Sequence, residues 1–150
     1  PKYQLPMKKF GIFKTYPSDE QLPIFRGFDD LFYMPHSRHT EVRQADIEKV
    51  PELNIIAKSP EAGVSIVSSR HGRDFYILGH LEYAPNTLDN EYHRDLGKRD
   101  DVALPQHYYR DDDPEQGYKV RWRSAANLFY SNWIDYYVYQ ETPFNISDIK

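Results

Sequence analysis

The stretch Phe75-Tyr76-Ile77-Leu78-Gly79-His80-Leu81-Glu82, residues 75–82, decides how the rest of the chain is organised. Its four apolar residues run without a break to Gly79, a pattern typical of a buried strand in an α/β sheet. Glycine at that point allows the backbone to turn out of the sheet. We therefore expect His80 and Glu82 to follow the carboxyl end of a strand, which is where open α/β sheets bind their ligands.

His80 and Glu82 are two residues apart, so in an extended segment their side chains point to the same side. A carboxylate in that place can hold one tautomer of the imidazole and stabilise the imidazolium. The spacing predicts two members of a nucleophile–histidine–acid triad. A Gly-His pair at a strand end is also common in simple turns, so a purely structural histidine stays open as an alternative.

The composition fits one domain with a real core, because the chain has 150 residues and is rich in Tyr and Phe. A net charge of −4, with acids and bases interspersed, argues against a nucleic-acid partner. We see no apolar run of membrane-spanning length and no signal peptide, and therefore expect a cytoplasmic protein without membrane contact. The chain has no cysteine, which excludes disulfides, cysteine-based zinc sites and a cysteine nucleophile within these residues.

Further strands are predicted at residues 53–59 and 63–69, and the turn at 71–74 makes a hairpin between the second of these and the strand that ends before His80. Residues 10–13 read as a short strand. Residues 32–39 read as the end of a strand that passes into a loop, because Pro35 argues against a central strand.

Two helices are predicted, one at residues 87–96 and one at about 125–140. Asn86 or Thr87 can cap the first helix, and Gly97 ends it. The apolar stripes of the two helices are, respectively, Leu88, Tyr92 and Leu96, and then Leu128, Phe129, Trp133, Tyr136 and Tyr137. Residues 98–120 form a long polar connection, of the kind that is often either functional or poorly ordered.

Two groups of residues suggest a metal site at first sight, and both are better explained otherwise. His36 and His39 are three residues apart, but no carboxylate or third histidine completes a ligand set. The acidic run 111–113 lacks the spacing of a calcium-binding EF-hand loop. We expect no metal ion.

Seven short motifs occur in order along nearly the whole chain: Phe-Arg-Gly-Phe-Asp-Asp at 25–30, Met-Pro-His-Ser-Arg-His-Thr-Glu-Val at 34–42, Gly-His-Leu-Glu-Tyr at 79–83, Asn-Glu-Tyr-His-Arg-Asp at 90–95, Asp-Asp-Pro at 112–114, Trp-Arg-Ser at 122–124 and Ser-Asn-Trp at 131–133. With these motifs the chain resembles the homoserine O-acyltransferase family, which includes homoserine O-succinyltransferases and O-acetyltransferases.

The resemblance implies an α/β fold of the class I glutamine-amidotransferase-like (flavodoxin-like) type, with a mostly parallel sheet flanked by helices. Family members are longer, and this chain resembles their carboxyl-terminal half. We therefore expect residues 1–150 to be a single-domain fragment of the acyltransferase domain. The missing amino-terminal half would then carry the catalytic cysteine and the oxyanion hole, and the fragment alone would be inactive.

In the family, a cysteine thiolate takes an acyl group from acyl-CoA and passes it to the hydroxyl of homoserine, in methionine biosynthesis. Such transfer needs a base beside the nucleophile and a group that orients the base. By resemblance, His80 is the base and Glu82 the orienting acid. Leu81 stands where the family usually has proline, which changes no reacting group. No cofactor is implied, because acetyl-CoA or succinyl-CoA is a co-substrate.

Three more positions match the family's contacts to the amino-acid substrate: Lys8, Ser37 and Arg94. Arg94 suits the substrate carboxylate through a bidentate contact, Ser37 offers a hydrogen bond, and Lys8 adds positive charge. Considered on spacing alone, each of the three is an ordinary surface or loop residue. The resemblance also implies a homodimer.

Three other functions remain open from the sequence. Serine in place of homoserine would give an O-acetyltransferase of cysteine biosynthesis, and one methylene group is worth only about 1–3 kcal/mol of discrimination. A glutamine-amidotransferase-like hydrolase would share the His-x-Glu element, although the motifs at 34–42 and 122–124 argue against it. A non-enzymatic binding fragment is the last alternative. Neither the acyl donor nor the acceptor is settled by these residues.

Overall fold

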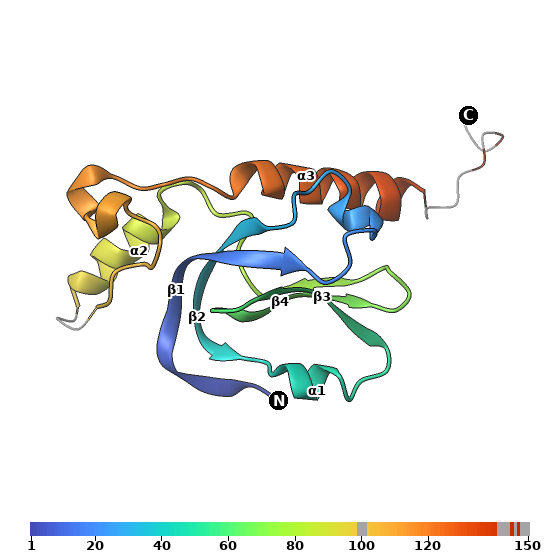
Figure 1. Ribbon diagram of the computed structural model, residues 1–150, viewed down its shortest axis with the longest axis horizontal. Coiled ribbons are helices and arrows are strands. Elements are labelled where there is room, and N and C mark those ends of the chain that lie inside the picture. The colour runs from blue at the N-terminus through green and yellow to red at the C-terminus, as the bar shows by residue number, and fades with distance from the viewer. Residues whose placement is uncertain (99–101, 141–144, 146, 148–150) are drawn as a thin grey trace.

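A computed structural model describes residues 1–98, 102–140, 145 and 147. It shows one five-stranded sheet with α3 lying along one side and α2 at one end (Figure 1). The strands are β1 (Tyr3–Pro17), β2 (Phe32–Glu41), β3 (Leu53–Ser59), β4 (Gly63–Ser69) and β5 (Phe75–Ile77). The helices are α1 (Gln44–Ile47), α2 (Thr87–Leu96) and α3 (Arg123–Trp133), and a π-helical segment (Ile134–Tyr139) continues α3.

The sheet has the strand order β2-β1-β3-β4-β5, and all four neighbouring pairs of these strands are antiparallel. The mostly parallel sheet that the resemblance implied is therefore not what the described strands form. The sequence carries the reason, since β3, β4 and β5 follow one another through short turns, and short turns join antiparallel neighbours. A parallel pair needs a long crossover connection.

β1 is much longer than the predicted strand at residues 10–13, and it bends sharply along its course (Figure 1). It pairs with β2 over most of its length and reaches β3 only through Tyr16 and Pro17. β2 is also longer than predicted, and Pro35 lies within it, opposite Ile12. A proline is tolerated there because β2 is an edge strand, as the sequence indicated.

The predicted strands at 53–59 and 63–69 are confirmed as β3 and β4, and the hairpin between β4 and β5 is confirmed as well. The prediction of a buried strand before Gly79 was wrong. β5 is a short edge strand of only three residues, with Tyr76 half exposed and its two neighbours partly covered. An apolar run of this length does not distinguish a central strand from an edge strand that a helix covers on one face.

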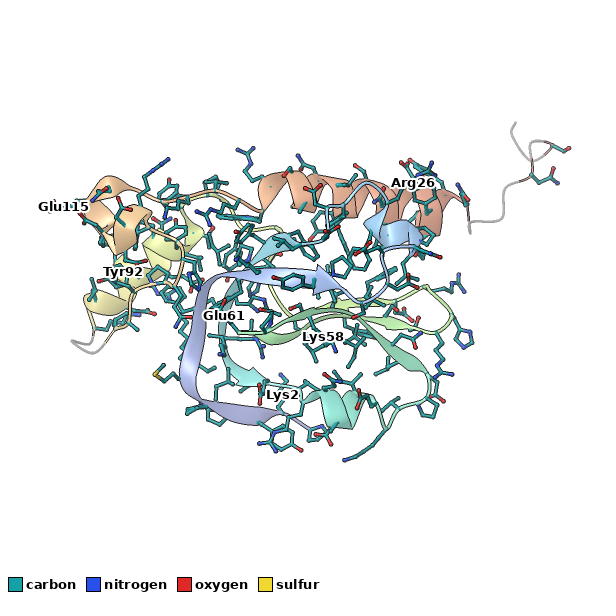
Figure 2. The ribbon with its side chains drawn as sticks, viewed as in Figure 1. Lys2, Arg26, Lys58, Glu61, Tyr92 and Glu115 are labelled. Carbon is teal, nitrogen blue, oxygen red and sulfur yellow. The ribbon has the colours of Figure 1, made fainter. Side chains whose placement is uncertain are left out.

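The larger part of the core lies between the sheet and α3, where side chains fill the space (Figure 2). Phe129 of α3 packs in one cluster with residues of β2, β3 and β4 and with Leu81 of the 79–83 motif. A second cluster joins the middle of β1 to α2, and it consists of Phe10, Ile12, Leu88, Tyr108, Tyr109 and Trp122. The motif segment 79–83 therefore lies between the two clusters.

The predicted helices are confirmed in place, but their buried faces differ from the predicted stripes. On α2 Leu88 is buried while Leu96 is exposed, and the side chain of neither Asn86 nor Thr87 caps the helix. On α3 Trp133 is exposed, whereas Asn132 is buried and donates hydrogen bonds to the carbonyls of Ile24 and Arg26 at 3.0 and 2.9 Å. A buried amide that bonds two carbonyls holds the 3₁₀ turn Pro23–Phe25 against α3.

The described part of the connection after α2, residues 102–120, is more ordered than its polar composition suggested. Tyr108 and Tyr109 are fully buried, and Gln106 exchanges backbone hydrogen bonds with Phe10 and Ile12 of β1 at 2.8 and 2.9 Å. Gly11 makes this approach possible, because a Cβ there would lie 2.2 Å from the Gln106 carbonyl oxygen. Within the described residues, no helix combines the length and the apolar character that crossing a membrane requires.

Candidate active site

The imidazole of His80 and the carboxylate of Glu82 are in direct contact, with 2.8 Å between His80 Nδ1 and Glu82 Oε1. This is the contact that the i, i+2 spacing predicted. The His80 side chain is about one-third exposed (35%) and the Glu82 side chain is 58% exposed, so the pair lies at the surface and can be reached. With Nδ1 engaged by the carboxylate, Nε2 is the nitrogen left to exchange a proton with a reacting group.

The backbone around His80 is held against β2 rather than extended beyond β5. The His80 amide donates to the Pro35 carbonyl at 2.8 Å. Gly79 lies so close to β2 that an added Cβ would come within 2.4 Å of Met34 Sδ and 2.8 Å of the Pro35 oxygen. Gly79 is therefore required for close packing, and this contact fixes the catalytic-base candidate to the strand that carries Ser37.

Tyr83, the last residue of the same motif, lies flat on His80. The two ring centroids are 4.2 Å apart and the ring planes differ by 11°. Trp122, which is fully buried, donates its indole N–H to the Tyr83 carbonyl at 3.0 Å. The motifs at 79–83 and 122–124, which are far apart in the sequence, thus meet at this point.

A pocket of about 470 Å³ opens beside Tyr83 and gathers the three predicted substrate residues from three separate elements. Lys8 comes from β1, Ser37 from β2 and Arg94 from α2. The pocket wall consists of Lys8, Ser37, His39, Tyr83, Glu91, Arg94, Asp95 and Lys98. The pocket therefore brings the three predicted substrate residues together. His80 adjoins the pocket through its stacking on Tyr83, and Glu82 contacts His80.

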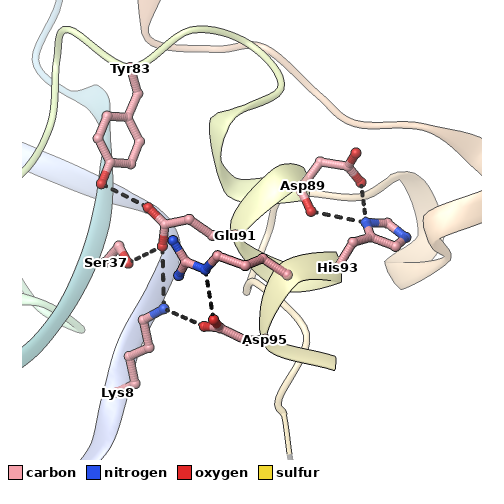
Figure 3. A network of polar contacts seen from close by, with 8 residues as sticks. Lys8, Ser37, Tyr83, Asp89, Glu91, His93 and Asp95 are labelled. Atoms are coloured by element: carbon pink, nitrogen blue, oxygen red, sulfur yellow. Dashed lines mark hydrogen bonds and ion pairs between the residues drawn. The ribbon is translucent and has the colours of Figure 1, made fainter. Parts of the chain in front are cut away.

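Glu91 is the centre of this pocket, and it was not among the site residues predicted from the sequence. Its Oε2 accepts hydrogen bonds from Ser37 Oγ at 2.5 Å and from Lys8 Nζ at 3.3 Å, and its Oε1 accepts one from Tyr83 Oη at 3.0 Å (Figure 3). A signal was present, because Glu91 lies in the motif at 90–95 and precedes Arg94 by three residues. On a helix that spacing places two side chains on one face.

The surroundings of Glu91 keep it ionised. Partial burial raises the pKa of its carboxyl, but the hydrogen bonds from Ser37 and Tyr83 and the charge of Lys8 outweigh burial, and the net pKa is lowered. The Tyr83 phenol shifts the other way. Burial first and the nearby Glu91 charge second raise its pKa, so it remains a hydrogen-bond donor.

Arg94 lies at the mouth of the pocket, and its side chain is 56% exposed. Its Nε pairs with Asp95 Oδ1 at 2.9 Å, and the hydrogen bond from Arg94 is the main reason that the pKa of Asp95 is lowered. Asp95 also lies 3.8 Å from Lys8 Nζ. The ion pair with Asp95 fixes the direction of the guanidinium at its Nε edge.

His36 and His39 do not share a site. His36 is fully buried against Phe13, whereas His39 is exposed and lies in the pocket wall. Among the described residues, no group of three or more His, Asp or Glu side chains is placed to hold a metal ion. Asp111 and Asp112 lie in one 3₁₀ turn, and Asp113 caps the next one, where its side chain accepts from the Glu115 amide.

Known structures share this fold. A glutamine amidotransferase from Thermotoga maritima matches 93% of this chain and 55% of its own length, with a TM-score of 0.60 at 12% identity. A glutamine amidotransferase from Methylobacillus flagellatus matches 89% of this chain and 55% of its own length, with a TM-score of 0.52 at 11% identity. At such low identity these matches report on the fold alone, and they confirm the predicted glutamine-amidotransferase-like α/β class.

Curated relatives are much closer in sequence. The homoserine O-acetyltransferase of Bacteroides thetaiotaomicron is 57% identical over 150 residues, which are all of this chain and 49% of the relative. The homoserine O-acetyltransferase of Brevibacillus brevis is 52% identical over 149 residues, again 49% of the relative. The chain thus spans about half the length of these relatives. A protein-family model described as homoserine O-succinyltransferase matches residues 1–144, and by that match the chain belongs to the homoserine O-succinyltransferase family.

Proposed function

We propose that this chain is the carboxyl-terminal half of a homoserine O-acyltransferase that acts in methionine biosynthesis. The observation that carries the proposal is the convergence of Lys8, Ser37 and Arg94 on one pocket beside the His80–Glu82 pair. Residues from β1, β2 and α2 meet there only because of the tertiary fold. An unrelated surface would not collect the predicted acceptor contacts next to the predicted base.

The charges of the pocket suit a free amino acid. Three cationic side chains (Lys8, Arg94 and Lys98) face two carboxylates (Glu91 and Asp95). The substrate carboxylate would bind towards Arg94, and the substrate ammonium group would bind towards Glu91. A carboxylate has about four acceptor positions, and Glu91 uses three of them for Tyr83, Ser37 and Lys8, which leaves one for the ammonium group.

The reaction would proceed in two steps around His80, with a cysteine supplied by the amino-terminal half. In the first step the cysteine thiolate attacks the thioester carbonyl, the new enzyme thioester forms, and CoA leaves as a thiolate that takes a proton from His80. In the second step the homoserine hydroxyl gives its proton to Nε2 of His80 as its oxygen attacks the acyl carbon, and the cysteine leaves as a thiolate. Glu82 holds the imidazole and stabilises its protonated form in both steps.

The donor that we propose is acetyl-CoA. The curated relatives at 57% and 52% identity are named as acetyltransferases, although the family description names succinyl transfer. To test this, kcat/KM of the full-length protein is measured for four substrate pairs. Acetyl-CoA and succinyl-CoA are each assayed with homoserine and with serine. The highest kcat/KM for acetyl-CoA with homoserine would support the proposal. A higher kcat/KM with serine than with homoserine would support the alternative, a serine O-acetyltransferase.

Substitution of the proposed base tests the chemistry. In the full-length protein, His80→Ala and Glu82→Ala should each lower the rate of acyl transfer by about 10²–10⁴-fold, as expected for loss of general acid–base catalysis. The exposed residue His93 lies outside the pocket wall, so His93→Ala is the matched histidine control and should keep normal activity. Normal acyl transfer by His80→Ala would exclude the proposed triad. Glutamine hydrolysis by the wild-type protein, without acyl transfer, would support the glutamine-amidotransferase-like hydrolase instead of the proposed function.

A further inference from the structure

We infer that Tyr83 is a positioning residue that links the base His80 to the acceptor-binding carboxylate Glu91. The inference rests on the proposed function and deepens it, because it says how the two halves of the site keep a fixed separation. Tyr83 is in contact with both groups at once, through its ring face to His80 and through its hydroxyl to Glu91. No element of the reaction scheme above assigns it a role.

The stacking contact restrains the plane of the imidazole. A centroid distance of 4.2 Å with an angle of 11° between the planes places the His80 ring parallel to the phenol ring and in contact with it. The bond from Nδ1 to Glu82 Oε1 restrains the same ring at its edge. Together the two contacts fix both the tilt and the rotation of the imidazole, so that Nε2 keeps one direction.

The hydroxyl contact restrains the carboxylate. Ser37 and Lys8 both bond Oε2 of Glu91, whereas Tyr83 bonds Oε1 at 3.0 Å (Figure 3). Among the described residues, Tyr83 is the only donor within hydrogen-bond distance of Oε1. Removing the hydroxyl would free one end of the carboxylate and alter the position that faces the substrate ammonium group.

Tyr83 is itself held firmly enough to act as a rigid link. Its carbonyl accepts from the buried Trp122 indole at 3.0 Å, and its amide donates to the His80 carbonyl at 3.3 Å. Burial and the charge of Glu91 keep the phenol protonated, as the raised pKa indicates. Because the backbone of Tyr83 is anchored and its hydroxyl stays protonated, the side chain can hold Glu91 and His80 at a fixed distance from each other.

Two substitutions separate the two contacts. Tyr83→Phe keeps the stacked ring and removes the hydroxyl, so the first step should stay within about twofold of normal while KM for homoserine rises about tenfold, a typical effect of losing one hydrogen bond. Tyr83→Leu removes both contacts, so the first step should also fall by about tenfold or more. Tyr118→Leu is the control, since it breaks another stacked tyrosine pair, with Tyr108, outside this pocket.

The experiment uses the full-length protein and three readouts. Rapid mixing with acetyl-CoA measures the burst of CoA release in the first step, and steady-state assays over a range of homoserine concentrations measure the second. Proton NMR of the histidine rings, with the His80 signal assigned by its loss in His80→Gln, reports the upfield shift that the Tyr83 ring imposes. That shift should persist in Tyr83→Phe and disappear in Tyr83→Leu.

The outcomes distinguish this inference from the proposed function. Equal losses in both steps for Tyr83→Phe and Tyr83→Leu, or a His80 signal that is unchanged in Tyr83→Leu, would overturn the linking role. Normal acyl transfer in both Tyr83 variants would overturn it as well, and would leave the proposed function intact. A wild-type protein that forms no acyl-enzyme and transfers no acyl group would instead overturn the proposed function.

Discussion

At the scale of single residues, side chains of opposite charge face one another in the pocket. Glu91 is ionised and accepts three hydrogen bonds, and Arg94 is held at Nε by Asp95. Arg94 gains little stability from its ion pair with Asp95, because its side chain is exposed and exposed ion pairs are worth little in water. The position of Arg94 at the mouth of the pocket therefore fits the proposed recognition of a small zwitterion better than a role in stability.

Arg94 should act on the acceptor and not on the acyl donor. Arg94→Ala in the full-length protein should raise KM for homoserine about tenfold or more, because the substrate carboxylate loses its cationic partner, and should leave KM for acyl-CoA unchanged. Arg94→Lys keeps the charge but lacks the planar guanidinium, so its KM for homoserine should lie between those of the wild type and Arg94→Ala. Steady-state kinetics measure these values, and equal changes in both KM values would contradict the carboxylate role.

His36 should make the protein sensitive to acid. Burial first and the nearby charge of Arg38 second lower the pKa of His36 to about 3, and a weak interaction with the Leu78 backbone does not offset this. Because the unfolded histidine has a pKa of about 6.5, the stabilising effect is complete above that pH and is lost as pH falls from about 6.5 towards 3. The free energy of unfolding should fall by about 1.4 kcal/mol for each pH unit in that range.

Urea unfolding at pH 7.0 and 5.5 measures this effect in the full-length protein. The wild type should lose about 1.3 kcal/mol more than His36→Leu over that interval, because the leucine variant has no group to protonate at this site and the loss begins only near pH 6.5. His71 is exposed, so His71→Gln should behave like the wild type. Identical pH dependence in the wild type and His36→Leu would show that His36 titrates normally in the folded protein.

At the scale of secondary-structure elements, the site depends on how tightly the 79–83 segment packs on β2. The contact between the His80 amide and the Pro35 carbonyl joins the segment to the strand, and Trp122 holds its other end. These attachments bring the base candidate and Ser37 to one edge of the sheet. The motif at 122–124, which had no evident chemistry in the sequence, therefore has a structural role in the site.

Gly79→Ala should disturb this packing. The added Cβ would meet Met34 Sδ at 2.4 Å and the Pro35 oxygen at 2.8 Å, and overpacking of this kind costs about 1–3 kcal/mol. Gly97→Ala is the matched control, because a Cβ there would make only ordinary contacts of 3.6 Å or more. Thermal unfolding should show a lowered Tm for Gly79→Ala alone, and acyl transfer should fall with it. An unchanged Tm would mean that β2 accommodates the methyl group.

At the scale of the whole molecule, the chain carries the proposed base, the proposed orienting acid and the proposed acceptor pocket, but it contains no cysteine. The proposed acylation step therefore needs a sulfur from outside these residues. The apolar side chains of β5 and the exposed Trp133 of α3 line one hollow on the surface, so the molecule also leaves part of its apolar surface uncovered. Homodimer formation and a cytoplasmic location stay predictions.

The isolated chain should therefore be inactive. Purified residues 1–150, mixed with acetyl-CoA or succinyl-CoA and homoserine, should release no CoA above the background of buffer, because no thiol is present to accept the acyl group. The full-length protein, assayed in parallel, is the positive control. Turnover by the isolated chain would contradict the cysteine mechanism and would call for direct transfer to the hydroxyl.

The sequence by itself determined the strands at 53–59 and 63–69, the hairpin that follows, the helix at 87–96, and the contact between His80 and Glu82. These features are local, because turns, helical periodicity and an i, i+2 spacing act over a few residues. The proposed acceptor-binding residues Lys8, Ser37 and Arg94 were predicted only through family motifs, since nothing local distinguishes them.

Only the tertiary structure decided the rest. It placed β5 at an edge, paired β1 with both β2 and β3, and brought Glu91 and Tyr83 to the centre of the site. Contacts between Glu91 and Lys8, or between Trp122 and Tyr83, join residues that are tens of positions apart. Such contacts depend on how the sheet bends and how the helices pack on it, and that packing is a property of the whole chain rather than of any short segment.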